Sequence, residues 1–155
     1  MKEEQIMKNG TYERILAPID GSDISEQVAN KAASIAHRDS AHLDLLYVID
    51  TNSMSGVAAI SVTGDVVYHL VQDSQTRLEG YRDQVLELFP DLDIDIHMRF
   101  GSPKKVIATE FPQDHDNDLT VIGKSGLSRL ERLIVGSVAS FVVQNSKTDV
   151  MIVQN

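Results

Sequence analysis

The sequence predicts an α/β fold in which five parallel strands form one sheet with helices on both of its faces. Two observations support this prediction. Short apolar segments alternate with amphipathic helical segments along the 155 residues, which is the order expected of strand–helix–strand units. Residues 42–49 (HLDLLYVI) are mostly apolar at consecutive positions, as in a central strand that is covered on both sides.

The first strand and the helix after it are marked by a turn. The predicted strand, residues 13–19 (ERILAPI), ends at the turn formed by residues 20–22 (DGS). A helix should follow up to about Arg38, because apolar residues recur there at helical spacing. Ser22 or Asp23 can supply the side-chain oxygen that caps its first turn.

The second strand ends at Asp50, and a loop and a long helix are expected after it. The residues from Thr51 to Gly64 are small and polar and have no sustained period, which predicts a long loop of the kind that is often functional. Asp65 is expected to cap the next helix, in which apolar positions recur at helical spacing until Pro90 ends it.

A short helix is predicted between the third and fourth strands. Residues 92–100 (LDIDIHMRF) alternate apolar and polar side chains, as an edge strand with one wetter face does. Ser102 is placed to cap the helix that follows, with Pro103 at its first position and Pro112 ending it. Residues 113–118 (QDHDND) are expected to form a polar loop.

Two further strands complete the sheet. Residues 119–123 (LTVIG) predict the fourth strand, residues 137–145 a helix, and residues 149–153 (DVMIV) the fifth strand. Asp20 and Asp50 lie directly after the first two strands, and a glycine ends the fourth. Because the carboxyl ends of parallel strands share one edge, these residues should meet where such sheets bind ligands.

A glycine pattern near the C-terminus predicts a phosphate-binding site. Gly123, Gly126, Gly136 and Ser137 form a G-x2-G-x9-G-S spacing directly after the fourth strand. Glycine lets the backbone come close to an anion, and the free N–H groups of the helix that begins here attract negative charge. The predicted ligand is a nucleotide.

Simpler interpretations of these residues stay open. The glycines could merely end a strand and begin a helix, and Asp20 could merely cap its own turn. A P-loop is excluded, because Asp118 stands where that motif requires a glycine.

The composition excludes several kinds of partner and chemistry. With 23 acidic and 14 basic residues the net charge is −9, which repels nucleic acid and anionic membranes. The absence of cysteine excludes thiol chemistry. No segment approaches the roughly 20 apolar residues of a membrane span, and no apolar leader is evident, so we expect a cytoplasmic protein. The five histidines lack metal-ligand spacing, so no metal site is expected, and no residue is assigned a catalytic role.

The chain resembles the universal stress protein family in motifs that span nearly its whole length. These are APIDGS at the end of the first strand, the long loop after the second, G-x-P before the third helix, and the glycine pattern. The resemblance implies a Rossmann-like three-layer sandwich with strand order 3-2-1-4-5. It implies one nucleotide-binding domain over residues 1–155, with residues 1–11 as a loose tail, and ATP as the ligand, with Mg2+.

Position by position, the resemblance also implies which residues bind ATP. They are Pro18, Ile19, Asp20, Val48, Ile122, Gly123, Gly126, Gly136, Ser137 and Val138. Ser125 and Ser140 are candidates for a contact with phosphate or Mg2+, because Ala139 stands where many ATP-binding members carry serine or threonine. The family commonly dimerises through its last strand, here Val150 to Val153.

These expectations favour a non-enzymatic module, a cytoplasmic dimer whose ATP-bound state regulates partner interactions or stress tolerance. Two alternatives stay open: an enzyme that slowly hydrolyses ATP or phosphorylates itself, and a family member that has lost ATP and acts through its dimer surface. A phospho-accepting receiver domain is disfavoured, because residues 100–102 lack its acceptor aspartate. The loop from Thr51 to Gly64 is expected to fold over the bound base or against the second subunit.

Overall fold

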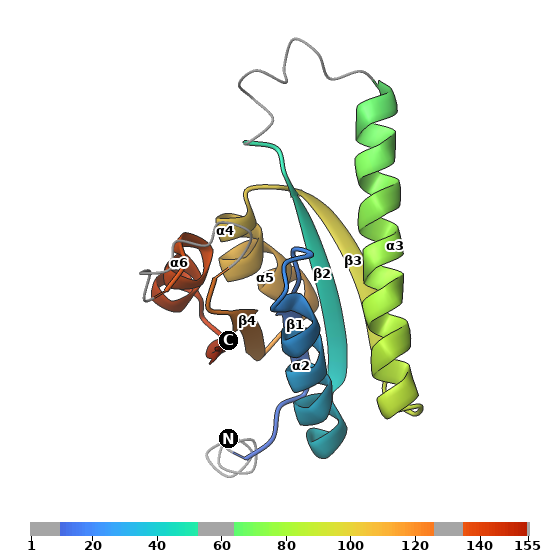
Figure 1. Cartoon of the computed structure of the whole chain (residues 1–155). Coiled ribbons are helices and arrows are strands. Elements are labelled where there is room, and N and C mark those ends of the chain that lie inside the picture. The colour runs from blue at the N-terminus through green and yellow to red at the C-terminus, as the bar shows by residue number, and fades with distance from the viewer. Residues whose placement is uncertain (1–9, 53–63, 126–134, 155) are drawn as a thin grey trace.

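The computed structural model describes residues 10–52, 64–125 and 135–154 and shows a five-stranded parallel sheet between two layers of helices (Figure 1). The strands are β1 (Arg14–Pro18), β2 (His42–Asp50), β3 (Ile94–Gly101), β4 (Leu119–Gly123) and β5 (Asp149–Val153). Their order is β3-β2-β1-β4-β5 and all neighbours are parallel, which confirms the predicted fold. β3 lies at an edge, as its alternating sequence predicts.

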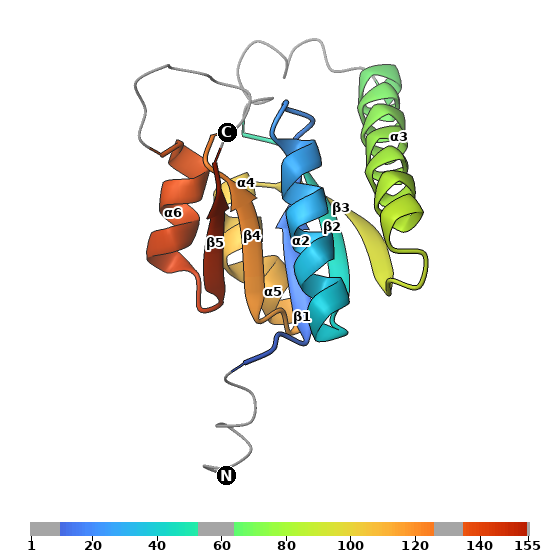
Figure 2. The same ribbon diagram turned by 60° about the horizontal axis from the view of Figure 1, so that its bottom comes forward.

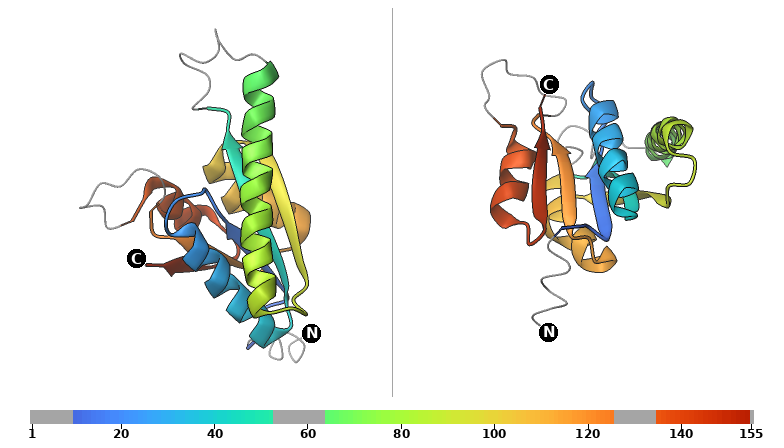
Figure 3. Two further views of the ribbon diagram at one scale, coloured as in Figure 1. Left: turned by 45° about the vertical axis from the view of Figure 1, so that its right-hand side comes forward. Right: turned by 90° about the horizontal axis from the view of Figure 1, so that it is seen from below.

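Helices cover both faces of the sheet (Figures 2 and 3). One face carries α2 (Ser25–Asp39) and α3 (Gly64–Leu88), and the other carries α4 (Pro103–Lys105), η2 (Val106–Glu110), α5 (Phe111–His115) and α6 (Ser137–Asn145). The core follows this division, because α2 and α3 pack into one hydrophobic cluster and η2, α5 and α6 into another. No helix in the described part of the chain combines the length and hydropathy that a membrane span requires.

The side chains of β2 pack into both clusters, as a doubly covered strand requires. Leu43 and Leu45 face the cluster of α2 and α3, and Leu46 faces the cluster of η2, α5 and α6. All three are fully buried, and each contributes on the order of 2 kcal/mol to the hydrophobic stabilisation of the fold.

Asp44 interrupts this apolar strand with a fully buried carboxylate. Its Oδ1 accepts a hydrogen bond from Nε2 of His97 (2.8 Å) and lies 3.0 Å from Nε2 of His42. Its Oδ2 accepts hydrogen bonds from Nδ2 of Asn117 (2.9 Å) and Nη2 of Arg14 (3.2 Å). Burial alone would raise the pKa of Asp44, but these hydrogen bonds and the neighbouring basic side chains outweigh burial and hold the pKa below its usual range.

The predicted N-caps of α2, Ser22 and Asp23, are wrong. The N-cap is Ile24, and no side chain caps the helix. The reason is a turn organised by Asp20, whose Oδ1 accepts hydrogen bonds from the backbone N–H of Ser22 (3.0 Å) and from Oγ of Ser25 (3.0 Å). The helix begins only after this turn is complete.

Helix α3 begins slightly earlier and is more exposed than the sequence predicts. It begins one residue before Asp65, which therefore lies in the first turn and is not the cap. Within its apolar stripe Ser74, Leu78 and Val85 are buried, but Leu88 is exposed. The helix packs on the β2–β3 side of the sheet, and its N-terminal end continues past these strands (Figure 1), so only part of the stripe faces the core.

The helix after β3 does not end at Pro112, which corrects the prediction. Ser102 is the N-cap and Pro103 takes the first position, as expected, although no side chain caps the turn. The chain then continues through the π-helical η2 and α5 until Asp116, which has a φ of 54°. The π turn ends just before Pro112, which thus lies in the first turn of α5, where its missing N–H is tolerated, so residues 113–115 are helical.

Two expected segments lie largely outside the described residues. Residues 1–9 belong to the predicted tail, and residues 53–63 belong to the predicted loop from Thr51 to Gly64. The expectation that this loop covers the bound base or contacts a second subunit therefore stays a prediction.

Gly80 gives a prediction about stability. It lies inside α3, is exposed, and an added Cβ would meet no atom within 4 Å. The change Gly80→Ala is expected to raise the free energy of unfolding by roughly 0.5–1 kcal/mol, because alanine loses less backbone entropy in a helix. Urea unfolding of both proteins measures the difference. A loss of stability would contradict the open surroundings of this position.

Candidate functional site

A cavity of about 620 Å³ opens at the carboxyl ends of β1, β2 and β4. The strand order reverses at this place, since β1 has β2 on one side and β4 on the other, and such switch points bind ligands in open α/β sheets. The volume lies within the range of roughly 300–1,000 Å³ that is typical of small-molecule sites. Asp20, Asp50 and Gly123 all line the cavity, so the predicted shared edge is present.

Most of the residues predicted to bind ATP line this one cavity. They are Pro18, Ile19, Asp20, Val48, Ile122, Gly123, Gly136, Ser137 and Val138, and the candidate Ser125 joins them. Gly126 lies outside the described residues. The structure does not bring Ser140 to the lining, because Ser140 lies within α6, where its N–H donates to the carbonyl of Gly136 (2.9 Å).

Part of the cavity lining is apolar. Pro18 and Ile19 at the end of β1 contribute to it, together with Val48 on β2, Ile122 on β4 and Ile107 on η2. Ile19, Ile107 and Ile122 are largely buried, so their positions are fixed by the core behind them. An apolar lining of this kind stabilises a flat ring by removing its apolar surface from water.

Asp20 is both a turn residue and a lining residue. Its Oδ1 accepts the hydrogen bonds from Ser22 and Ser25 that hold the turn. None of the described residues donates a hydrogen bond to Oδ2, so this oxygen can accept one from a ligand hydroxyl or amine. The two interpretations of Asp20 are therefore compatible.

Gly123 and Gly136 allow close contacts that a side chain would disturb. A Cβ on Gly123 would lie 2.8 Å from Cγ2 of Ile24, and a Cβ on Gly136 would lie 3.2 Å from both the carbonyl oxygen of Lys124 and Cα of Ser125. The N–H of Gly136 also donates to that carbonyl at 2.7 Å. The start of α6 is thus held against the segment that follows β4.

The first turn of α6 lines the cavity through Gly136, Ser137, Val138 and Ala139. The first bond inside the helix runs from the N–H of Ser140 to the carbonyl of Gly136. The N–H groups of the three residues before Ser140 therefore have no acceptor within the helix, and no side chain caps this end. Such N–H groups, at the positive end of the helix dipole, attract anions.

Several contributions to the lining are absent from the sequence-based prediction, among them Ile24, Ser25 and Val28 at the start of α2. Leu70 and Ser74 come from α3, and Pro103 and Ile107 come from the helical segments after β3. Ser74 is buried and its hydroxyl donates to the carbonyl of Leu70 (2.7 Å). The contribution of α3 could have been predicted from Ser74, a serine within an otherwise apolar stripe. The contribution of the residues after β3 could have been predicted because they follow a strand that ends at the same sheet edge.

The fold and the cavity together define a doubly wound α/β protein with an anion-attracting pocket at the switch point of its sheet. A model of the universal stress protein family matches residues 11–154. A protein of Staphylococcus saprophyticus that is named as a universal stress protein is 33% identical over 153 residues, covering 93% of this chain and 84% of the relative. The chain belongs to the universal stress protein family.

Solved structures agree with this assignment. The universal stress protein UspA from Lactobacillus plantarum is 28% identical and has a TM-score of 0.77, covering 94% of this chain and 99% of that one. A universal stress protein crystallised in complex with cAMP is 26% identical with a TM-score of 0.71, covering 93% of this chain and 98% of that one. The Rossmann-like order of the strands is thus shared with members of known structure.

Proposed function

We propose that the protein binds ATP with Mg2+ in this cavity and acts as a nucleotide-dependent regulatory or stress-tolerance module. The observation that carries the proposal is that apolar side chains and an uncapped helix N-terminus line one cavity. An adenine ring favours the first and phosphate groups the second. Membership of the family and the complex of a 26% identical relative with cAMP support an adenine nucleotide as the ligand.

The base and the ribose are assigned to the apolar residues of the cavity lining. Pro18, Ile19 and Val48 contact the base, and Ile122 flanks the ribose. Asp20 accepts a hydrogen bond through Oδ2 from a ribose hydroxyl or the adenine amine, which fixes the orientation of the nucleoside.

The phosphates are assigned to the glycine pattern. Gly123 lies along the first phosphates, where the family resemblance also predicts Gly126, and the free backbone N–H groups of Ser137 and Val138 donate to the phosphates beyond them. The hydroxyls of Ser125 and Ser137 are the neutral oxygens available to a phosphate or to Mg2+, which prefers oxygen ligands.

The protein is proposed to bind ATP without hydrolysing it or transferring its phosphate. The described lining includes two carboxylates: Asp20, whose Oδ2 is assigned above to the nucleoside, and Asp50, whose Oδ1 accepts a hydrogen bond from the N–H of Asn52 (2.9 Å). Phosphoryl transfer requires a group free to position water or a hydroxyl nucleophile. We therefore expect ATP to remain intact during incubation with the protein.

The proposed assembly is a homodimer through Val150 to Val153 of β5. This strand lies at the edge of the sheet opposite β3 and pairs only with β4 in the described chain. An edge strand can pair with a second copy of itself through its free backbone groups. A monomer in sedimentation equilibrium at high protein concentration would contradict this interface.

Isothermal titration of nucleotide-free protein tests the proposed function. We expect one ATP per chain with a dissociation constant on the order of 1–100 μM in the presence of Mg2+. A parallel titration with cAMP measures how much affinity the additional phosphates provide, and a phosphate-release assay tests for turnover. No binding by the folded protein at about 1 mM ATP would contradict the proposal.

A further inference from the structure

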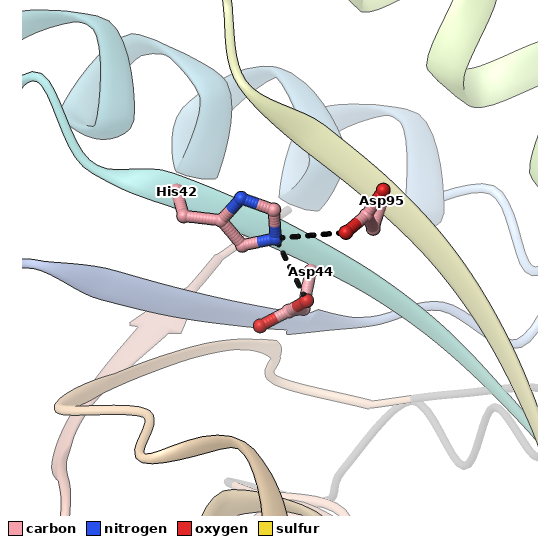
Figure 4. A group of neighbouring side chains, drawn as sticks. All are labelled: His42, Asp44 and Asp95. Carbon is pink, nitrogen blue, oxygen red and sulfur yellow. Dashed lines mark hydrogen bonds and ion pairs between the residues drawn. The ribbon is translucent and has the colours of Figure 1, made fainter.

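A second cluster of polar side chains lies at the amino ends of β2 and β3, at the sheet edge opposite the cavity. His42 and Asp44 lie two residues apart on β2, and Asp95 on β3 is the register partner of Asp44. Figure 4 shows Nε2 of His42 directed at the carboxylates of Asp44 and Asp95. The side chain of Asp44 is 0% exposed, that of His42 12% and that of Asp95 66%, so the cluster has a buried floor and an open mouth.

Both ring nitrogens of His42 face carboxylate oxygens. Nδ1 lies 2.8 Å from Oδ2 of Asp93, while Nε2 lies 3.0 Å from Oδ1 of Asp44 and 3.4 Å from Oδ2 of Asp95. A neutral imidazole carries one N–H. When that N–H donates to Asp93, the lone pair of Nε2 faces two negative oxygens. This arrangement requires a cation between them, either a second proton or a metal ion.

The spacing of these atoms fits a divalent transition metal. Nε2 of His42 and the two carboxylate oxygens all lie within 4.8 Å of one another. Zn2+ binds such atoms at about 2.1 Å, so neighbouring ligands of a tetrahedral site lie about 3.4 Å apart. The separations of 3.0 and 3.4 Å at His42 are close to this value, so a metal ion can enter with small side-chain movements.

The surroundings of Asp44 leave one of its oxygens directed at the cluster. Oδ2 accepts hydrogen bonds from Asn117 and Arg14, whereas Oδ1 faces His42 and His97 and receives a longer contact from Arg14 (3.4 Å). Asn117 is itself 8% exposed, its amide is directed at Asp44, and its carbonyl oxygen is buried with no hydrogen-bond partner among the described residues. The side chain that contacts Oδ2 of Asp44 therefore carries a buried oxygen that no protein donor in the described chain satisfies.

The charges of the cluster also favour a divalent ion. Asp44, Asp93 and Asp95 carry three negative charges, and the guanidinium of Arg14 is in contact with Asp44. With neutral histidine rings two negative charges remain uncompensated among these groups. A divalent cation balances them, and it removes the repulsion that carboxylates this close exert on one another.

We propose that Nε2 of His42, Oδ1 of Asp44 and Oδ2 of Asp95 bind a divalent transition metal ion, Zn2+ being the best match, with water as a further ligand. An imidazole ligand favours Zn2+ over Mg2+ or Ca2+. Asp93 holds the Nδ1–H of His42, as the carboxylate partners of metal-bound histidines do. The ion joins the amino ends of β2 and β3 and stabilises the folded chain by mass action.

Titration of tag-free, nucleotide-free protein with Zn2+ tests this proposal. We expect one ion per chain, and an affinity at least roughly 10–100-fold lower in Asp95→Asn, whose exposed side chain the fold does not need. Asp91→Asn is the matched control, because it removes the same charge from an exposed position just before β3. Co2+ bound to the wild-type protein should show the visible absorption of tetrahedral coordination, and this signal should be lost in Asp95→Asn.

Thermal unfolding provides a second measurement. Zn2+ should raise the Tm of the wild-type protein and of Asp91→Asn but not that of Asp95→Asn. Equal losses of Zn2+ affinity in the two variants would overturn the proposal, because they would indicate diffuse attraction to an acidic surface. Wild-type protein that shows no saturable binding at about 1 mM Zn2+ would overturn it as well, and a proton would then be the cation at His42.

Discussion

Replacing Gly136 with valine is expected to lower the affinity for ATP at least roughly 100-fold, the equivalent of losing one or two hydrogen bonds to a charged group. A Cβ at this position already lies 3.2 Å from the carbonyl oxygen of Lys124 and from Cα of Ser125, and valine adds two methyl groups to it. The start of α6 must move away from the segment after β4. Its free N–H groups then no longer converge on the phosphates. Isothermal titration measures the loss.

The φ of −65° and ψ of 163° at Gly136 suit any residue, so the change acts through contact rather than through backbone strain. Circular dichroism should show a folded variant, and Gly80→Ala serves as a control with unaltered ATP affinity. Wild-type affinity in a folded Gly136→Val protein would mean that the phosphates do not contact the start of α6.

Replacing Asp44 with asparagine is expected to destabilise the fold by about 3 kcal/mol, because it leaves buried donors without an acceptor. The carboxylate accepts hydrogen bonds from His97, Asn117 and Arg14, whereas the new amide has one oxygen and directs an NH2 group at these donors. Arg14 is partly exposed, so water compensates part of the loss. Urea unfolding of both proteins in a buffer with a metal chelator measures the change in the free energy of unfolding without any effect of a bound metal ion.

Asp83→Asn is the matched control. Asp83 accepts a hydrogen bond from Arg82 (3.1 Å) on the exposed surface of α3, and its replacement should change the free energy of unfolding by less than about 0.5 kcal/mol. If Asp44→Asn lowers the free energy of unfolding by as little as Asp83→Asn does, the buried hydrogen-bond network around Asp44 contributes little to stability. ATP affinity should be unchanged in the folded Asp44→Asn protein, because the cavity lies at the other end of the strands.

The strands could be predicted from the sequence because their signals are local. The apolar run of residues 42–49 and the alternation in residues 92–100 are visible without any neighbour, and both segments are strands in the sheet. The cavity followed from the same information, because parallel strands place Asp20 and Gly123 at one edge.

The helix ends could not be predicted in the same way. The start of α2 depends on hydrogen bonds of Asp20 that compete with capping by Ser22. The continuation past Pro112 depends on a π turn that no propensity reveals. In both places a specific backbone geometry outweighed the preference of a single residue.

The polar cluster was missed because its members lie far apart in the chain. A search for histidines at helical spacing excludes it, yet His42 and Asp44 lie two apart, as do Asp95 and His97, and in a strand this spacing puts each pair on one face. With β2 and β3 adjacent, the two pairs meet. Two-residue spacing on neighbouring strands was therefore the signal that sequence analysis could have used.

The bond between His97 and Asp44 also determines how β3 aligns with the rest of the sheet. β3 is an edge strand without a fully buried side chain, so hydrophobic contacts alone discriminate weakly between neighbouring alignments. Sliding β3 by one residue would turn the imidazole to the opposite face and leave the buried carboxylate with one donor fewer. The hydrogen bond between His97 and Asp44 thus fixes the register of β3 against β2.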